Sequence, residues 1–162
     1  MSAEIDKTFW YKFVEPTQGK FVSPDDAGWL KRDGPDNDNQ MFCFVTGNSG
    51  LIAGTEIGST YRPMIWTMQE GLRPGVYYVR LSEPPIDRNF KYCWFNIVLE
   101  QGKYRIYEPT KKECVGVGTQ GFLIRWEKDN GATQLYTLSA IRKITPAEQK
   151  QIDRLVGPPN EE

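Results

Sequence analysis

The sequence predicts a mainly β domain of the α+β class, with about eight short, mostly antiparallel strands arranged as a barrel or a strongly bent sheet. Aromatic residues make up 13% of the 162-residue chain, and aromatic rings suit a pleated, half-buried surface. Short apolar or alternating runs recur between turns rich in glycine, proline and asparagine. Only two short stretches carry helix-start signals, so strands dominate the expected fold.

The length of the chain is that of one ordinary domain. We expect a single globular domain over residues 1–156, followed by a disordered acidic tail over residues 157–162. No internal repeat, heptad or low-complexity segment is visible along the chain. The sequence therefore gives no reason to divide the domain into smaller units.

The expected strands follow one another at short intervals. Their ranges are 8–14, 41–46, 64–68, 76–81, 90–99, 104–107, 122–127 and 133–138. Alternation in the first run places Phe9, Tyr11 and Phe13 on one face of the sheet. Residues 101–103 predict a hairpin between two of these runs, and Asn130-Gly131 predicts a second hairpin between the last two.

Two short helices are expected. Ser23 followed by Pro24 is a start signal for a helix near residues 24–30. Thr145 and Glu148 form a capping box for a helix near residues 146–155, with Pro146 at its first position. Residues 33–39 contain no large apolar side chain and carry three aspartates, which predicts an acidic surface loop and excludes an EF-hand, since its required glycine and glutamate are missing.

Three cysteines and a polar N-terminus point to the cytoplasm. Cys43 and Cys93 lie in apolar runs, where a thiol usually behaves as a small buried hydrophobe. Cys114 follows two lysines, and we expect it to be the most exposed of the three. No apolar run is long enough to cross a bilayer, so no membrane association is expected.

The chain contains no histidine. This absence excludes a Ser-His-Asp or Cys-His arrangement and nearly all ordinary catalytic zinc sites. Residues 116–121 have the spacing G-x-G-x-x-G, but a strand-like run follows where a dinucleotide loop requires a helix. We therefore expect a protein that is not an enzyme and that has no cofactor and no metal site.

Aromatic and basic residues recur as neighbours along the predicted strands. If several of them gather on one exposed surface, they form the kind of patch that anchors a partner. The simpler interpretation is that the rings lie in the core and the charges extend past them. The candidate binding residues are Tyr61, Arg62, Tyr78, Arg80, Tyr104, Arg105, Tyr107, Arg125 and Trp126.

The favoured function is a non-enzymatic interaction module that binds and modulates a protein partner, as inhibitors, immunity proteins and accessory subunits do. A β-barrel that binds a small anionic ligand through arginines is the first alternative. A single-stranded nucleic-acid binder that uses the basic stretch 111–144 is the second. The net charge of −1 argues against general nucleic-acid binding.

Overall fold

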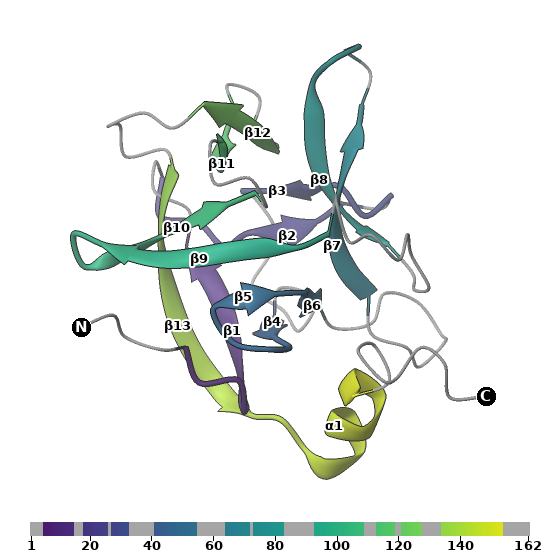
Figure 1. The fold of residues 1–162 in the computed structure, drawn as a ribbon, viewed down its shortest axis with the longest axis vertical. Coiled ribbons are helices and arrows are strands. Elements are labelled where there is room, and N and C mark those ends of the chain that lie inside the picture. Colours follow the sequence, from purple (N-terminus) through teal and green to yellow (C-terminus); the bar gives the residue numbers. More distant parts are fainter. Residues whose placement is uncertain are drawn as a thin grey trace.

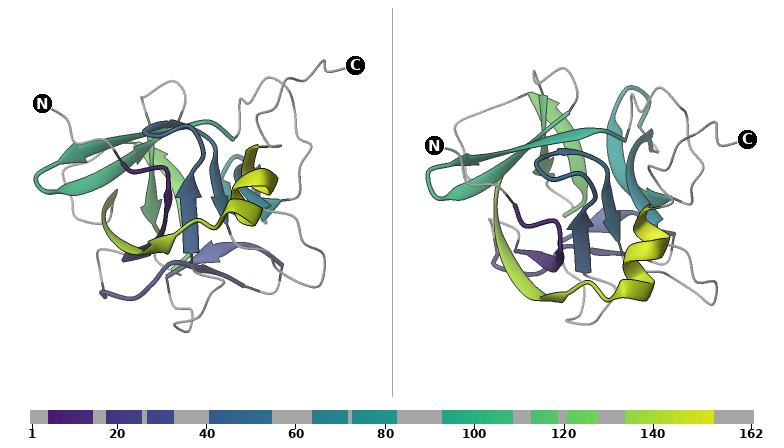
Figure 2. Two further views of the ribbon diagram at one scale, coloured as in Figure 1. Left: turned by 90° about the horizontal axis from the view of Figure 1, so that it is seen from below. Right: turned by 60° about the horizontal axis from the view of Figure 1, so that its bottom comes forward.

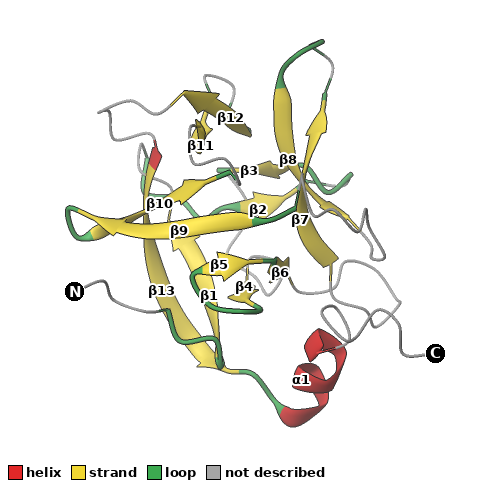
Figure 3. Ribbon diagram, in the orientation of Figure 1, coloured by secondary structure: helices red, strands yellow, loops and turns green. Residues whose placement is uncertain are grey.

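A computed structural model describes residues 5–14, 18–25, 27–32, 41–54, 64–71, 73–82, 93–108, 113–118, 121–127 and 134–153. The first strands are β1 (Phe9–Val14), β2 (Ser23–Pro24), β3 (Leu30–Lys31), β4 (Met41–Phe44), β5 (Ser49–Gly50) and β6 (Ile52–Gly54). The later strands are β7 (Met64–Glu70), β8 (Tyr77–Ser82), β9 (Phe95–Glu100), β10 (Lys103–Tyr107), β11 (Glu113–Val117), β12 (Leu123–Glu127) and β13 (Leu135–Lys143). One helix, α1 (Pro146–Asp153), follows them. The predicted mainly β class with a C-terminal helix is confirmed (Figures 1 and 3).

The strands close into an antiparallel barrel. Nine of them form a ring in the order β11-β12-β8-β7-β6-β4-β1-β13-β10, which the pairing of β10 with β11 closes. The sheet also continues from β10 to β9, and β9 pairs on its other side with β5. Closure satisfies the backbone hydrogen bonds along these strands without leaving a continuous open edge.

The order of pairings divides the fold into three similar parts. Six strand positions lie outside the three hairpins, and we call them the barrel positions. They are β1, β4, the interrupted strand β5 and β6, β9, β10 and β13. Between them, in chain order, lie the hairpins β2–β3, β7–β8 and β11–β12. Each part therefore contributes two barrel positions and one hairpin.

Aromatic rings fill the interior of the barrel. Phe13, Phe42 and Trp66 have no exposed side-chain surface, and the ring of Phe13 lies 5.7 Å from that of Phe42 and 5.1 Å from that of Trp66. Phe95 extends the cluster through an edge contact with Trp66 at 5.8 Å. The high aromatic content of the sequence is thus used in large part by the core.

The helix α1 lies against the outer side of the barrel (Figure 2). A second apolar cluster, which includes Ile152 of α1, is buried there. Phe42 and Phe44 of β4 belong to the interior cluster, whereas Met41 and Cys43 belong to this outer one. Alternate side chains of β4 thus point to opposite faces, and both faces are buried. We call the outer cluster the α1 flank, with residues Trp10, Met41, Cys43, Leu51, Ala53, Ile65, Cys93 and Ile152.

The helix is attached to this flank mainly through one carboxylate. Glu148 accepts hydrogen bonds from Trp10 Nε1 at 3.0 Å, from Arg142 Nη1 and Nη2 at 3.0 and 2.9 Å, and from the backbone N–H of Thr145 at 2.9 Å. The Glu148 N–H in turn bonds Thr145 Oγ1 at 3.1 Å, which confirms the predicted capping box. These bonds, led by that from Arg142, lower the pKa of Glu148 to about 2.

Two local predictions are wrong. Residues 24–30 form no helix but the turn of the β2–β3 hairpin, because Asp25 Oδ1 accepts the N–H groups of Ala27 and Trp29 at 2.9 and 3.0 Å. This is an aspartate turn competing with a helix start. Strand β12 pairs with β11 and β8, and β13 pairs with β1 and β10, so the described parts of these two runs are not the hairpin partners expected; residues 129–131 themselves lie outside the described residues. The acidic loop 33–39 lies outside the described residues.

Candidate functional site

The structure separates the predicted binding residues into two groups. Tyr78 and Arg80 lie on β8 and Arg125 and Trp126 on β12, and these strands pair with each other. The residues predicted on β10 lie elsewhere, in a buried network described below. Tyr61 and Arg62 are outside the described part of the chain.

The three hairpins β2–β3, β7–β8 and β11–β12 each bury one side and expose the other. Leu30, Val79 and Leu123 are fully buried and belong to the interior cluster. Their sequence neighbours point away from the core, because successive side chains of a strand alternate between faces. We call this outward surface the cap face, with residues Trp29, Lys31, Tyr78, Arg80, Phe122, Ile124 and Trp126.

Each hairpin contacts the next through one pair of residues on the cap face. Trp29 is bridged to Arg80, and Phe122 is bridged to Lys31. Tyr78 pairs with Ile124. Each pair joins an aromatic residue of one hairpin to the third residue of the Trp29-Leu30-Lys31, Tyr78-Val79-Arg80 or Phe122-Leu123-Ile124 segment of another. Because the same contact occurs three times, the cap face has an approximate threefold arrangement.

The rings at the centre of this arrangement contact one another by their edges. Trp29 and Tyr78 have ring centroids 6.0 Å apart at an interplanar angle of 77°, and Tyr78 and Phe122 are 6.1 Å apart at 84°. Two cations lie on the outer rings, with Arg80 5.0 Å above Trp29 and Lys31 5.7 Å above Phe122. On the cap face, these contacts between aromatic and basic residues are thus formed across hairpins.

Trp126 lies further along β12 and is 56% exposed. Alternation puts it on the same side of the strand as Ile124 and on the opposite side from Arg125. The Arg125 guanidinium lies 4.3 Å from the Tyr77 ring and pairs with Glu113 at 2.8 Å. Arg125 therefore fixes β12 behind the surface while the indole of Trp126 is presented to solvent.

A polar group adjoins the rings on β7 and β8. Thr67 is paired with Arg80, and Gln69 with Tyr78, in the register of the two strands. Gln69 Nε2 donates to Thr67 Oγ1 at 2.9 Å and to Ser82 Oγ at 2.8 Å. The cap face thus combines exposed rings, a guanidinium and ordered amide and hydroxyl groups, which are the components of a polar-ligand site.

The residues predicted on β10 form a buried network. The Arg105 side chain, 2% exposed as a residue, donates from Nε to Glu100 at 2.8 Å and from Nη1 to Gln134 at 2.6 Å. Tyr107 donates its hydroxyl to Glu100 Oε2 at 2.7 Å. Tyr104 is half-buried against the interior cluster. These contacts join the β9–β10 hairpin to β13 and do not extend the cap face.

Burial and the Glu100 carboxylate set the protonation of this network. Burial alone would lower the pKa of the Arg105 guanidinium, but the hydrogen bond and negative charge of Glu100 raise it above its usual value. Burial first, and then the same carboxylate, raises the pKa of the Tyr107 phenol to about 12. Arg105 is therefore charged and Tyr107 neutral throughout the physiological pH range.

All three cysteines are buried. The prediction for Cys43 and Cys93 is confirmed, and burial raises the pKa of the Cys43 thiol to about 12. The expectation that Cys114 is exposed is wrong, because it lies on β11 with no exposed surface. Within the described ranges, no group of three or more cysteine, aspartate or glutamate residues is placed to hold a metal ion.

The G-x-G-x-x-G spacing falls in the β11–β12 hairpin. Gly116 pairs with Ile124 inside that hairpin, and the Gly121 N–H donates to the Gly118 carbonyl at 3.0 Å. The hairpin context confirms that this segment is a turn followed by a strand. In the described part of the chain, strand β12 and not a helix follows Gly121, so the amide-lined helix start that binds a dinucleotide pyrophosphate is not formed there.

Sequence reasoning missed Trp29, Lys31 and Phe122. The signal that could have found them is a pattern of three consecutive residues. The first is an outward-facing aromatic residue, the second is a buried aliphatic residue, and the third again faces outward. The pattern occurs as Trp29-Leu30-Lys31, Tyr78-Val79-Arg80 and Phe122-Leu123-Ile124. The domain therefore has an internal repeat that the sequence alone does not make visible, since its copies are short and lie far apart.

Comparison with solved structures identifies this architecture. The designed threefold-symmetric protein ThreeFoil matches with a TM-score of 0.57 and 15% identity over 82% of this chain and 99% of its own. The ricin B-like lectin of Macrolepiota procera, solved with lactose, matches with a TM-score of 0.60 and 13% identity over 83% of this chain and 97% of its own.

The chain has a β-trefoil fold. A structure of the exo-β-1,3-galactanase 1,3Gal43A from Clostridium thermocellum also matches this trefoil, with a TM-score of 0.61 and 15% identity over 85% of this chain but 31% of its own. No protein-family model and no curated protein sequence matches the chain. Within the described residues, the trefoil has no helix long and apolar enough to span a membrane.

Proposed function

We propose that this protein is a non-enzymatic binding module that recognises a saccharide on the cap face. The observation that carries the proposal is the row of half-exposed rings from three hairpins, together with the exposed indole of Trp126 on the same face of β12. Sugar rings present an apolar C–H face that packs on aromatic rings, while their hydroxyl groups need polar partners. Gln69 and Arg80 supply such partners beside the rings.

The fold of the comparison structures supports this ligand class. One of them is a lectin whose structure contains lactose, and another match is an agglutinin from Rhizoctonia solani. Because these proteins share under a fifth of their residues with this chain, the ligand class is inferred for the cap face from its own chemistry and not transferred residue by residue.

The test is a glycan array probed with the fluorescently labelled protein, followed by calorimetry with the best ligand. We expect Trp126→Ala and Tyr78→Ala each to weaken binding at least tenfold, since both remove a stacking surface. Ile141→Ala is the matched control, because Ile141 is 43% exposed on β13, outside the cap face. Unchanged affinity in both ring variants, or no glycan bound at all, would refute the proposal.

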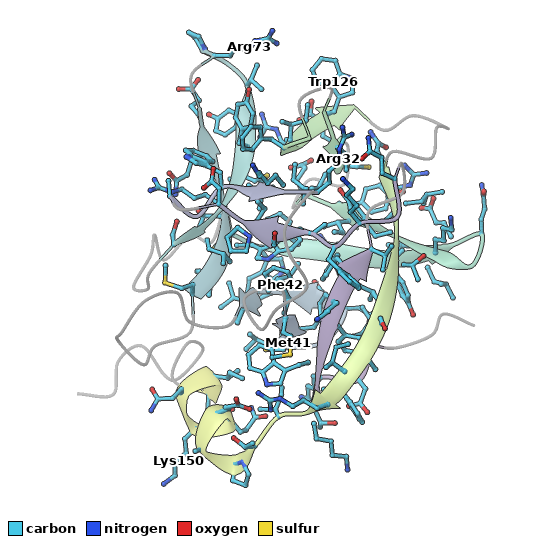
Figure 4. All side chains as sticks on the ribbon, turned by 180° about the vertical axis from the view of Figure 1, so that it is seen from behind. Arg32, Met41, Phe42, Arg73, Trp126 and Lys150 are labelled. Carbon is cyan, nitrogen blue, oxygen red and sulfur yellow. The ribbon has the colours of Figure 1, made fainter. Side chains whose placement is uncertain are left out.

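A protein partner remains the second proposal, of the inhibitor, immunity or accessory type. It is favoured by the β7–β8 hairpin, which extends beyond the body of the molecule (Figure 1). The tip is exposed at Arg73, and the Gly75 N–H bonds Glu70 Oε2 at 2.8 Å. If this tip binds a protein, Arg73→Glu should abolish recovery of that partner by affinity purification, whereas Lys150→Glu on α1, at the other end of the molecule (Figure 4), should not.

A further inference from the structure

Two contacts fix the position of Arg80 on the cap face. Its guanidinium lies 5.0 Å above the Trp29 ring, and its Nε donates to the Ala27 carbonyl at 2.7 Å. Gly28 allows this position. A Cβ on Gly28 would lie 2.8 Å from the Leu81 carbonyl oxygen, so a larger residue would force apart the backbones of the two hairpins that carry Trp29 and Arg80.

The fixed guanidinium keeps two donors for a ligand. Within the described residues, its one hydrogen bond is made by Nε, and the ion pairs formed there by arginines involve Arg105, Arg125 and Arg142 instead. The Nη1 and Nη2 groups therefore form a planar fork with no carboxylate partner in this part of the chain. Such a fork pairs with two oxygens of a carboxylate or sulfate group.

The fork lies beside stacking surfaces. Tyr78 precedes Arg80 by two positions on the same face of β8, and its ring contacts those of Trp29 and Phe122. We propose that the cap face binds an acidic saccharide, whose ring stacks on these aromatic side chains while its carboxylate or sulfate pairs with Arg80. This inference rests on the proposed function and specifies the ligand's charge.

The threefold arrangement supports an amphipathic ligand. The residue that faces each central ring is Arg80 at Trp29, Lys31 at Phe122 and Ile124 at Tyr78. Two of the three equivalent positions therefore carry a cation and the third an aliphatic side chain. A sugar with an acidic group on one edge and an apolar face matches this distribution better than a neutral sugar does.

Single-stranded nucleic acid also combines rings with negative charge, but it is less well matched. Its binding requires a track of cations that follows successive phosphates. Arg125 of β12 is directed away from the cap face and paired with Glu113. The two cations of the cap face suit one acidic group and not a phosphate chain.

Calorimetry with four probes tests the inference, namely a sulfated heparin oligosaccharide, an oligogalacturonate, a neutral galacto-oligosaccharide and single-stranded oligo-dT. We expect one of the two acidic saccharides to bind at least tenfold more tightly than the neutral one, and comparing them distinguishes sulfate from carboxylate. Arg80→Lys keeps the charge and loses the fork, so it should weaken that binding about tenfold, and Arg80→Gln more. Lys150→Gln, on α1, is the charge control.

The outcomes separate this inference from the proposed function. One outcome is that the neutral saccharide binds as tightly as the acidic ones, that Arg80→Lys has no effect, and that Trp126→Ala still weakens binding. This outcome would refute the acidic ligand and leave the saccharide function standing. If only oligo-dT binds, both are refuted. Thermal unfolding of the Arg80→Lys variant establishes that it is folded. If this folded variant binds the acidic probe as tightly as the wild type does, Arg80 is not the partner of the acidic group.

Discussion

The cap face and the α1 flank are both outer surfaces of the same barrel, but their side chains differ in kind. The flank carries aliphatic, methionine and cysteine side chains and one indole, that of Trp10, and all of them are buried against a helix. The cap face carries rings and cations and stays half-exposed. Purely apolar side chains require a cover, whereas rings with polar edges and cations tolerate water on one side. The difference indicates which surface serves stability and which is suited to binding.

Trp10→Ala in the α1 flank should have the largest effect on stability. The Trp10 side chain is buried, and its indole donates to Glu148, so the variant leaves a cavity and removes one of the hydrogen bonds that hold this carboxylate. We expect a loss of about 3–5 kcal/mol in the free energy of unfolding, measured by urea denaturation. Ligand affinity at a temperature where the variant is folded should be unchanged. A ligand affinity that falls with Trp10→Ala would contradict the division between the two surfaces.

On the β2–β3 hairpin, substitutions of the neighbouring residues Leu30 and Trp29 should affect different properties, stability in the first case and mainly ligand binding in the second. Leu30→Ala removes a fully buried side chain and should cost about 2–4 kcal/mol of stability. Trp29→Ala removes the contacts of a half-exposed ring and should cost about 1–2 kcal/mol of stability. The same variant should lower the affinity for the saccharide at least tenfold. Denaturation and calorimetry on the two variants give the comparison. Equal losses of stability would show that the two faces of the β2–β3 hairpin are not distinct.

Glu148→Gln should remove a pH-dependent part of the stability of the flank. The folded-state pKa of about 2 lies below the ordinary value of 4.5, so the carboxylate stabilises the fold fully above pH 4.5 and loses this effect as the pH falls toward 2. We expect the variant to be about 1–2 kcal/mol less stable at pH 7. Urea denaturation across this range should show the difference between wild type and variant shrinking in acid. A constant difference would mean that the charge of Glu148 is not its cause.

Lys31→Met should have the smallest effect on stability. A cation over an exposed ring contributes about 0.5–1 kcal/mol, and the methionine preserves contact with Phe122. We expect a change in the midpoint of thermal unfolding at the limit of detection, together with weaker binding of an acidic saccharide and unchanged binding of a neutral one. A large loss of stability would show that Lys31 belongs to the structural part of the hairpin.

Local patterns were sufficient for the fold class but not for the strand pairing. The strand near residues 8–14 and the capping box at Thr145 both depend on neighbouring residues, and both are confirmed. The strict alternation predicted for this strand is wrong, because a register shift between Trp10 and Tyr11 interrupts it. The turn at Asp25 was mistaken for a helix start because the same side chain can cap either structure. Asn130-Gly131 is a strong local hairpin signal, yet β12 finds its partners in β8 and β11, which no local pattern specifies.

The same limit applies to the candidate site. Tyr78, Arg80 and Trp126 were found as aromatic-basic neighbours, but Arg105 has the same local pattern and is buried with Glu100 and Gln134. Burial depends on which strands surround a residue, and the sequence does not give this. Trp29 and Phe122 were missed because their cations, Arg80 and Lys31, come from other hairpins.

The single aliphatic residue among the three equivalent positions of the cap face has a consequence for orientation. The backbone repeats its bridge three times, so its geometry alone would accept a ligand in three equivalent rotations. Ile124 removes this equivalence, because a ligand turned by one third of a revolution would place its polar edge against an aliphatic side chain and leave a cation unused. A domain built from three similar parts thereby acquires one docking direction.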